Sequence, residues 1–226
     1  MICYIPTKNR KNTKTYKLFE EAKIPVYHFI EPSEFDDYDV PNKINILEND
    51  KGVTYVRNFM LEHAKKNNEE WVIMCDDDVS SFGIHKGKTI KQGASIWKEI
   101  LIYVKPLPFE LIGINYTQHA WHETKVWSVN KKFAEVCVLM NVKKINWKYT
   151  KNTKEDRDFQ LQTIKNGYGV LRFNKYWFAC PDVGTNKGGA YDLYKNKVDL
   201  QWANALVKKW YPFAKIVKKN NRIDAK

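Results

Sequence analysis

Long apolar runs are missing from this sequence of 226 residues. No stretch approaches the roughly 20 apolar residues that a membrane-spanning helix needs. Neither a secretory signal peptide nor a lipidation motif is recognisable. We therefore expect a protein that works in the cytoplasm and does not contact a membrane.

Cysteine and glycine are also scarce, with four and ten residues. The cysteines are Cys3, Cys75, Cys137 and Cys180, and no two of them have the spacing of a zinc knuckle or a redox pair. We expect small buried residues in a reducing compartment. The glycines form neither a Walker loop nor a dinucleotide-binding fingerprint, which excludes both motifs for the polar, basic loop at residues 7–10.

Acidic residues number 26 against 38 lysines and arginines, which gives a formal net charge of +12 and a pI of about 9.3. This excess favours an anionic partner, such as nucleic acid, a membrane surface or a phosphorylated small molecule. Trp and Tyr are interleaved with the basic residues and stack well on unpaired bases, which favours nucleic acid. The alternative is that the lysines serve solubility alone.

The apolar periodicity predicts an α/β fold, because strands alternate with helices along the chain. Such an order is typical of a mostly parallel central sheet flanked by helices. We expect a single domain, 1–226, whose basic tail at residues 211–226 frays. The expected strands are 2–6, 24–30, 43–47, 71–75 and 133–142, with a closing hairpin of 170–173 and 176–180; the expected helices are 15–22, 53–64, 97–104, 155–165 and 198–210.

One stretch organises the chain: residues 71–75 are apolar, and Asp76, Asp77 and Asp78 follow at once. The run predicts a strand buried on both faces, and open α/β sheets bind ligands at the carboxyl ends of such strands. Alternation along an extended chain puts Asp76 and Asp78 on one side and Asp77 on the other. Mg²⁺ or Mn²⁺ carried by a phosphate-bearing ligand would relieve the repulsion between these acids. The alternative is a solvated acidic turn in which Asp78 caps a helix.

A second acidic group, residues 155–158, opens a predicted helix. Thr153 and Asp156 have the spacing of a capping box, and helix N-termini favour acids, so one interpretation is structural. The other is a carboxylate base that removes a proton from an acceptor hydroxyl. The earlier acidic group at a strand end favours this second interpretation.

Further side chains are candidates for ligand contacts. His119 and His122 could share a metal ion on a helix, although no third ligand is apparent. Trp121 could stack on a base or a sugar, or belong to the core. Gly188 and Gly189 could let the backbone approach a ligand closely, or form a turn.

In their order along residues 2–189, these motifs resemble the GT-A glycosyltransferases, which use nucleotide-sugar donors. The shared features are the first strand with its polar loop, a second strand ending in Glu31, a helix with Gly52, Arg57 and Asn58, the Asp-x-Asp triplet and the late Glu-Asp pair. More narrowly, residues 5–10, 30–32, 52–58 and 76–78 resemble the TET-associated glycosyltransferase family. Members of that family occur in bacteriophages and are thought to glycosylate hydroxymethylated pyrimidines in DNA.

The resemblance implies a GT-A-like, Rossmann-like fold in which residues 1–80 bind the nucleotide-sugar and residues 81–210 serve the acceptor and catalysis. Asp156, with Glu155 beside it, would be the base of an inverting reaction, and Asp76 and Asp78 would hold Mn²⁺ or Mg²⁺. Many GT-A enzymes add a late histidine to the metal shell, but this chain has none after His122. The donor would be bound by Pro6, Thr7, Arg10, Glu31, Arg57, Asp76 and Asp77, and the acceptor by Trp121, His122, Gly188 and Gly189.

The leading hypothesis is a metal-dependent glycosyltransferase that moves a sugar from a UDP-sugar to a hydroxymethylated pyrimidine in DNA. A phage-encoded protein of this kind would act in the cytoplasm of the infected host. The first alternative is the same fold acting on a polysaccharide, lipid or protein acceptor. The others are a nucleotidyltransferase or nuclease with paired acids on two metals, and a non-enzymatic basic nucleic-acid-binding module.

Overall fold

The computed structural model describes residues 1–11, 13–182, 185, 198–219 and 222–225 of the chain. Within these ranges, one ten-stranded sheet has the order β3-β2-β1-β4-β9-β7-β10-β5-β6, with β8 paired to β10, and β11 and β12 form a separate hairpin. The strands are β1 (Ile2–Thr7), β2 (Val26–Ile30), β3 (Lys43–Asn45), β4 (Trp71–Cys75), β5 (Ser81–Lys86), β6 (Lys88–Lys91), β7 (Phe109–Tyr116), β8 (Trp127–Val129), β9 (Cys137–Asn141), β10 (Gly169–Ala179), β11 (Ile216–Lys219) and β12 (Arg222–Ala225).

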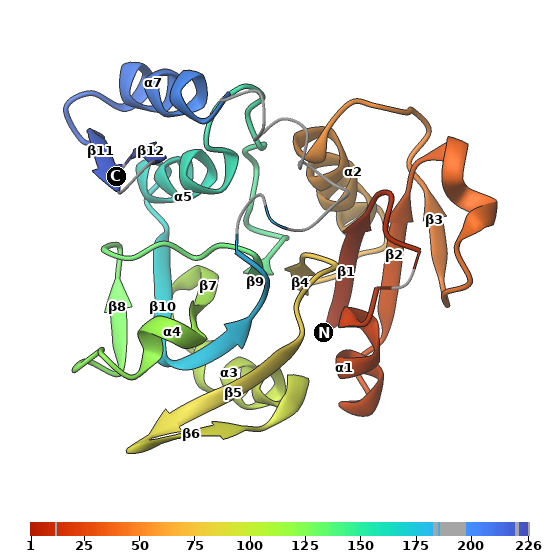
Figure 1. Cartoon of the computed structure of the whole chain (residues 1–226), viewed down its shortest axis with the longest axis horizontal. Coiled ribbons are helices and arrows are strands. Elements are labelled where there is room, and N and C mark those ends of the chain that lie inside the picture. Colours follow the sequence, from red (N-terminus) through yellow and green to blue (C-terminus); the bar gives the residue numbers. More distant parts are fainter. Residues whose placement is uncertain (12, 183–184, 186–197, 220–221, 226) are drawn as a thin grey trace.

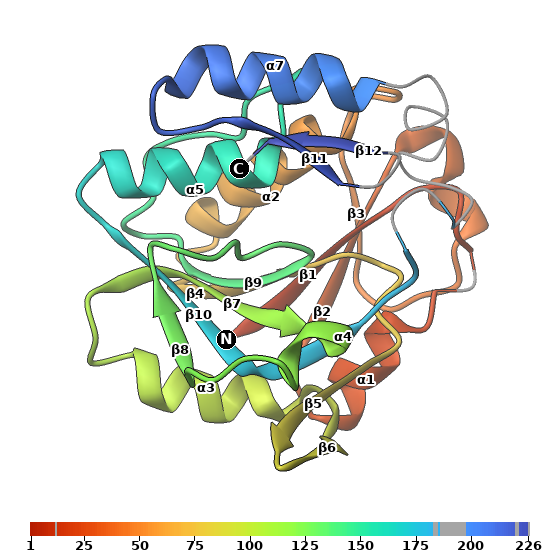
Figure 2. The ribbon, with the colours of Figure 1, turned by 60° about the vertical axis from the view of Figure 1, so that its left-hand side comes forward.

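Helices cover both faces of the sheet (Figures 1 and 2). One face carries α2 (Val53–Lys66) and α5 (Glu155–Lys165), and the other carries α1 (Thr15–Glu21) and α3 (Ile96–Val104). Beyond α5 lies α7 (Val198–Trp210). In the described ranges, no helix combines the length and the apolar character needed to span a membrane. The short helical turns are η1 (Pro32–Asp37), η2 (Gly93–Ser95) and α4 (Thr117–Ala120).

The strand directions bring several carboxyl ends to one edge of the sheet. β3, β2, β1 and β4 are parallel, and β7 is parallel to β10. Because β9 runs antiparallel between β4 and β7, these two strands point the same way. The predicted α/β fold, with mostly parallel central strands flanked by helices, is confirmed. The division into halves at residue 80 stays a prediction, because strands of both halves share this sheet.

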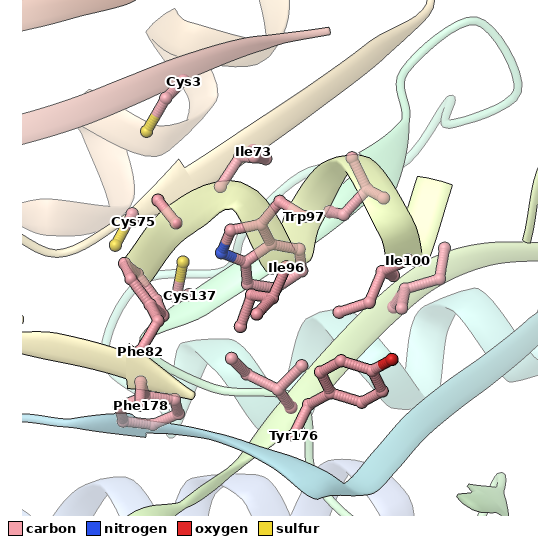
Figure 3. Close-up of a cluster of buried hydrophobic side chains, with 14 of the residues drawn as sticks. Cys3, Ile73, Cys75, Phe82, Ile96, Trp97, Ile100, Cys137, Tyr176 and Phe178 are labelled. Carbon is pink, nitrogen blue, oxygen red and sulfur yellow. The ribbon is translucent and has the colours of Figure 1, made fainter. Parts of the chain in front are cut away.

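The strands β1 and β4 are buried on both faces, as their apolar sequences predict. Cys3 and Ile73 belong to the cluster that contains Trp97 of α3 (Figure 3). Tyr4 and Met74 belong to the cluster on the opposite face, with the apolar side chains of α2 and α5. This two-sided packing fixes the position of the strand end that precedes the aspartates.

All four cysteines are free thiols, and Cys3, Cys75 and Cys137 are buried in the core, as predicted (Figure 3). Burial raises the pKa of each of these three thiols above its ordinary value. They remain protonated at neutral pH and therefore behave as small apolar side chains.

The predicted closing hairpin is wrong, because residues 169–179 form the single strand β10. Asn174 looks like a turn residue in the sequence, but it is fully buried, and its side-chain amide donates to the carbonyl of Lys125 and to Oγ of Ser128. A register shift between Phe173 and Trp177 then lets the strand change its outer neighbour from β8 to β5.

The expectation of a frayed tail is also wrong for the described residues. β11 and β12 pair antiparallel, and Ala225 is buried against Ala203 and Leu206 of α7. The lysines of the tail suggest a solvated segment, whereas Ala214 and Ala225 within it are buried. The strand expected at 133–142 is shorter and begins at Cys137, after Val136 with its positive φ of 66°.

Gly113 allows a close approach between β7 and the segment before β9. A Cβ added there would lie 2.4 Å from Cβ and 2.6 Å from Cα of Ala134. We expect Gly113→Ala to lower the free energy of unfolding by about 1–3 kcal/mol through overpacking. Urea unfolding measures this change, with Gln201→Ala on the exposed face of α7 as the control; equal midpoints for both variants would contradict the prediction.

Candidate active site

A small pocket lies at the carboxyl ends of β1 and β4 and contains about 230 Å³ of space, counting its open mouth. It collects residues from distant parts of the sequence, including four that the sequence singled out: Pro6, Arg57, Asp76 and Asp156. The complete lining is Pro6, Arg57, Met74, Cys75, Asp76, Val136, Val138, Tyr149 and Asp156.

Arg57 is the cation at the centre of this pocket, and its side chain is only 7% exposed. Its Nη2 donates to Oδ1 of Asp76 at 3.1 Å. Its Nη1 donates to Oε1 of Glu155 at 3.3 Å and to Oδ1 of Asp156. Arg57 therefore joins the two acidic groups, one after β4 and the other at the start of α5, while their paired role in catalysis stays a prediction.

Tyr149 completes the pocket, although the sequence analysis did not select it. Its ring centre lies 5.5 Å from the Arg57 guanidinium, and its ring stacks on Phe159 with 4.1 Å between centres. Asn58, next to Arg57 on α2, donates to the backbone carbonyl of Tyr149 and accepts from its backbone N–H. The only signal in the sequence is an aromatic residue shortly before the second acidic group, inside a segment that otherwise resembles a linker.

The two pocket carboxyls have raised pKa values. Burial, with repulsion from Glu155 and Asp76, raises the pKa of Asp156 to about 8, against the opposing attraction of Arg57. Burial also raises the pKa of Asp76 to about 6, again opposed by Arg57 and reinforced by Asp78 and Asp77. A pair of carboxyls with shifted pKa values in a pocket is typical of a catalytic site.

Asp77 anchors the loop that follows β1. Its carboxylate is 5% exposed and accepts hydrogen bonds from Oγ1 of Thr7 at 2.6 Å and from Arg10, and its carbonyl accepts from Oγ1 of Thr13. Arg10 also pairs with Asp78 at 3.1 Å. The predicted alternation is therefore wrong: Asp77 and Asp78 meet at Arg10, while Asp76 faces Arg57. Alternation fails because β4 ends at Cys75 and the chain is no longer extended.

Neither acidic group caps a helix. Residues 81–86 after the aspartates form β5, so Asp78 precedes a strand. The residue before α5 is Lys154, and no side chain caps this helix. Thr153 is buried, and its hydroxyl has no hydrogen-bond partner among the described residues, so the capping-box interpretation is wrong.

Glu31 lies at the end of β2 and is not among the residues that line the pocket. Glu31 is 3% exposed. Its carboxylate accepts hydrogen bonds from Nζ of Lys8 at 2.7 Å and from the backbone N–H of Asp50 at 3.1 Å. Lys8 also pairs with the Asp50 carboxylate at 2.5 Å. Lys8 and Asp50 were not selected from the sequence, although Lys8 stands within the basic loop that drew attention to Thr7 and Arg10.

The predicted acceptor residues Trp121 and His122 follow α4, which begins directly after the carboxyl end of β7. Both are exposed, Trp121 at 58%, and their rings stack with 3.4 Å between centres. Neither lines the pocket. Gly188 and Gly189 lie outside the described residues.

A protein-only metal shell is not formed by the residues that the structure describes, since no group of three His, Cys, Asp or Glu side chains is close enough to hold an ion. This applies to His119 and His122 too. Asp76 and Asp78 are partly exposed carboxylates, with side chains 34% and 21% exposed. Mg²⁺ or Mn²⁺ is ordinarily held by one or two carboxylates with phosphate oxygens and water, so the chemistry of Asp76, which pairs with Arg57, and of Asp78, which pairs with Arg10, fits an ion that arrives with a diphosphate.

The fold and the pocket define an α/β protein with a pocket at the carboxyl ends of parallel strands. The family model "TET-Associated Glycosyltransferase" matches residues 1–189, and the chain belongs to this family. It is therefore a glycosyltransferase, as its sequence motifs indicate. A search of curated proteins gave no match.

Among solved structures, "A197 from STIV" is similar to this chain with a TM-score of 0.50 at 9% identity, covering 78% of this chain and 83% of that chain. A putative nucleotide-diphospho-sugar transferase from Desulfovibrio desulfuricans G20 has a TM-score of 0.43 at 10% identity, covering 92% of this chain and 98% of that chain. A CMP:2-keto-3-deoxy-manno-octonic acid synthetase complexed with CTP has a TM-score of 0.44 at 10% identity, covering 92% of this chain and 98% of that chain. At these identities, the first similarity bears on the fold alone.

Proposed function

We propose that this glycosyltransferase transfers a sugar from a nucleotide-sugar, a UDP-sugar, to the hydroxymethyl group of a modified pyrimidine in DNA, with Mn²⁺ or Mg²⁺ as cofactor. The observation that carries the proposal is the pocket in which Arg57 joins Asp76, after β4, to Asp156, at the start of α5. Family membership and the net charge of +12 support it. For a phage-encoded protein, the place of action would be the host cytoplasm.

The donor half of the site consists of the segment after β1 and the end of β4. In the proposal, Arg57 binds the diphosphate, and Asp76 and Asp78 hold the ion, whose positive charge would stabilise the departing nucleotide. Asp77 keeps Thr7 and Arg10 in place through the hydrogen bonds described above. Pro6 and Glu31 complete the proposed donor contacts.

The reaction itself needs one proton transfer. A carboxylate oxygen of Asp156 takes the hydroxyl proton of the hydroxymethyl group, while the hydroxyl oxygen bonds to the anomeric carbon of the sugar. The bond from that carbon to the diphosphate breaks at the same time, and the electron pair leaves with the nucleotide. Attack from the side opposite the leaving group inverts the anomeric centre. Glu155 stays beside the base, and its negative charge adds to the effect of burial in raising the pKa of Asp156.

In this proposal Trp121 and His122 contact the acceptor, and Gly188 and Gly189, which lie outside the described residues, are acceptor residues by the sequence resemblance alone. Trp127 is 58% exposed, and the nearby Lys125 is also exposed. Exposed aromatic rings can stack on a base that leaves the duplex, while lysines contact the phosphates. Phosphate contacts make DNA binding dependent on salt and independent of sequence.

A transfer assay tests the proposal. The protein is incubated with Mn²⁺, a UDP-sugar and DNA that contains hydroxymethylated pyrimidines, and the digested nucleosides are analysed by mass spectrometry. We expect one added sugar on the modified nucleoside and none on the same DNA without the modification. An absence of product with UDP-, GDP- and CDP-sugars would contradict the proposal, and transfer to a polysaccharide, lipid or protein instead would replace the DNA acceptor.

The pH dependence of this activity identifies the base. Because a base works in its deprotonated form, kcat/KM should rise with pH and level off above the raised pKa of Asp156, about 8. Glu155→Gln removes a negative neighbour that raises this pKa, so the rising limb should move to lower pH. Initial rates at several pH values measure the shift. An unchanged profile in Glu155→Gln would contradict the assignment of Asp156.

A further inference from the structure

The first turn of α5 contacts a C-terminal segment, of which the structure describes residues 198–219 and 222–225. This segment lies beyond residues 1–189, which the family model matches. Figures 1 and 2 show α7 lying along α5, with the β11–β12 hairpin beside both. The pocket is on the other side of the same helical turn, because Glu155 and Asp156 reach Arg57 there.

One ion pair and one hydrogen bond flank Glu155 and Asp156. Nζ of Lys154, immediately before the helix, pairs with Asp199 at the start of α7. Nη1 of Arg157 donates to the backbone carbonyl of Ala225 at the end of β12. Arg157 also pairs with Glu135 at 3.0 Å through Nε. Lys154 and Arg157, on either side of Glu155 and Asp156, therefore both contact the C-terminal segment.

Asp158 is the most deeply buried of these contact residues, with a completely buried side chain. Its Oδ1 accepts a hydrogen bond from Nε1 of Trp210 at 2.7 Å, and the same Oδ1 lies 2.7 Å from Nζ of Lys209. Its Oδ2 accepts from Gln162 at 2.8 Å. A buried carboxylate is tolerated only when it is paired and hydrogen-bonded, and two of these three partners come from the end of α7.

Apolar contacts continue the same interface along the helix. Leu161, one turn further along α5, packs against the cluster of Ala203, Leu206 and Ala225. The C-terminal segment thus meets α5 with both polar and apolar contacts. The polar ones concentrate on the turn that carries the pocket acids.

We infer that residues 198–225 set the position of the catalytic carboxylate, with Asp158, Lys209 and Trp210 as positioning residues. This inference rests on the proposed function, which gives Asp156 the role of base. Asp158 fixes one side of the helical turn to α7, so that Asp156 on the other side reaches Arg57 and the acceptor hydroxyl. Small displacements of a reacting group are costly, since a shift of about 1 Å can lower a rate a hundredfold.

The test uses the double variant Lys209→Met/Trp210→Phe in the full-length protein. It keeps an aliphatic side chain and an aromatic ring at these positions but removes both α7 donors from Asp158. We expect kcat to fall by about tenfold or more while KM for the donor changes by less than about twofold, because the donor half of the site is untouched. The matched control is Lys208→Met, an exposed lysine on the same helix, which should keep the parent values.

Hydrogen exchange gives a second readout that does not depend on activity. Backbone amides of residues 158–165, which are hydrogen-bonded within α5, should exchange faster in the double variant than in the parent and in Lys208→Met, while those of β1 and β4 stay equal. Unchanged exchange in α5, or an equal loss of donor binding and kcat, would overturn the inference. If the double variant showed faster exchange in α5 but the parent protein transferred no sugar to DNA, only the proposed acceptor would be refuted.

Discussion

Asp156→Asn is expected to lower kcat by about 10²–10⁴-fold, the usual contribution of a general base. Asparagine keeps the size of the side chain and can still contact Arg57, but it cannot accept the proton of the acceptor hydroxyl. Donor binding should persist, because Asp76, Asp78 and Arg10 are unchanged. Transfer rates and a thermal shift with UDP and Mn²⁺ measure the two effects separately.

The control for this variant is Asp39→Asn, which removes the same charge from an exposed position before β3. It should retain the parent rate. If Asp156→Asn kept more than about a tenth of the parent rate, the residue could not be the base. A loss of the same size in Glu155→Gln at every pH would instead point to Glu155.

Arg57→Met is expected to cost about 3–5 kcal/mol of folding stability, the usual effect of breaking a buried ion pair from one side. The change leaves Asp76, Glu155 and Asp156 without their shared cation. The loss should grow as the pH rises, because the three acids then carry more charge. Chemical denaturation at several pH values measures the free energy of unfolding, and sugar transfer should be lost as well.

A double variant separates this effect from simple loss of packing. Arg57→Met/Asp156→Asn contains one uncompensated carboxylate fewer, so it should be more stable than Arg57→Met. Arg57→Lys keeps the positive charge and should recover part of the stability, but an ammonium group lacks the planar fork that reaches Asp76 and Asp156 together. If the double variant were no more stable than the single one, the three-acid arrangement around Arg57 would be unimportant for stability.

The sequence was informative where a local pattern forces the structure. The apolar run at residues 71–75 predicts a strand buried on both faces, and the acids after it lie at the edge of the sheet where the carboxyl ends of β1 and β4 meet. The same holds for α5, whose start at Glu155 was predicted. The contact of both acidic groups through Arg57 agrees with the paired-acid interpretation, although their roles in catalysis stay a prediction.

What the sequence could not supply depends on contacts between distant segments. Asn174 resembles a turn signal until Ser128 and Lys125 satisfy its amide inside the sheet. The direction of each aspartate was misjudged, because alternation holds only while the chain is extended, and Arg10 draws Asp77 and Asp78 together. Tyr149 enters the pocket through its hydrogen bonds with Asn58, which no spacing reveals.

The single guanidinium of Arg57 faces three carboxylates, and this imbalance has a consequence for the order of ligand entry. At a pH above the raised pKa of Asp156, about 8, where all three acids are ionised, the pocket would carry an excess of negative charge and repel a bare nucleotide-sugar. A donor already complexed with a divalent cation brings compensating charge. We therefore expect donor affinity to be low in the presence of a chelator, with cation and donor binding as one electrostatic unit rather than independently.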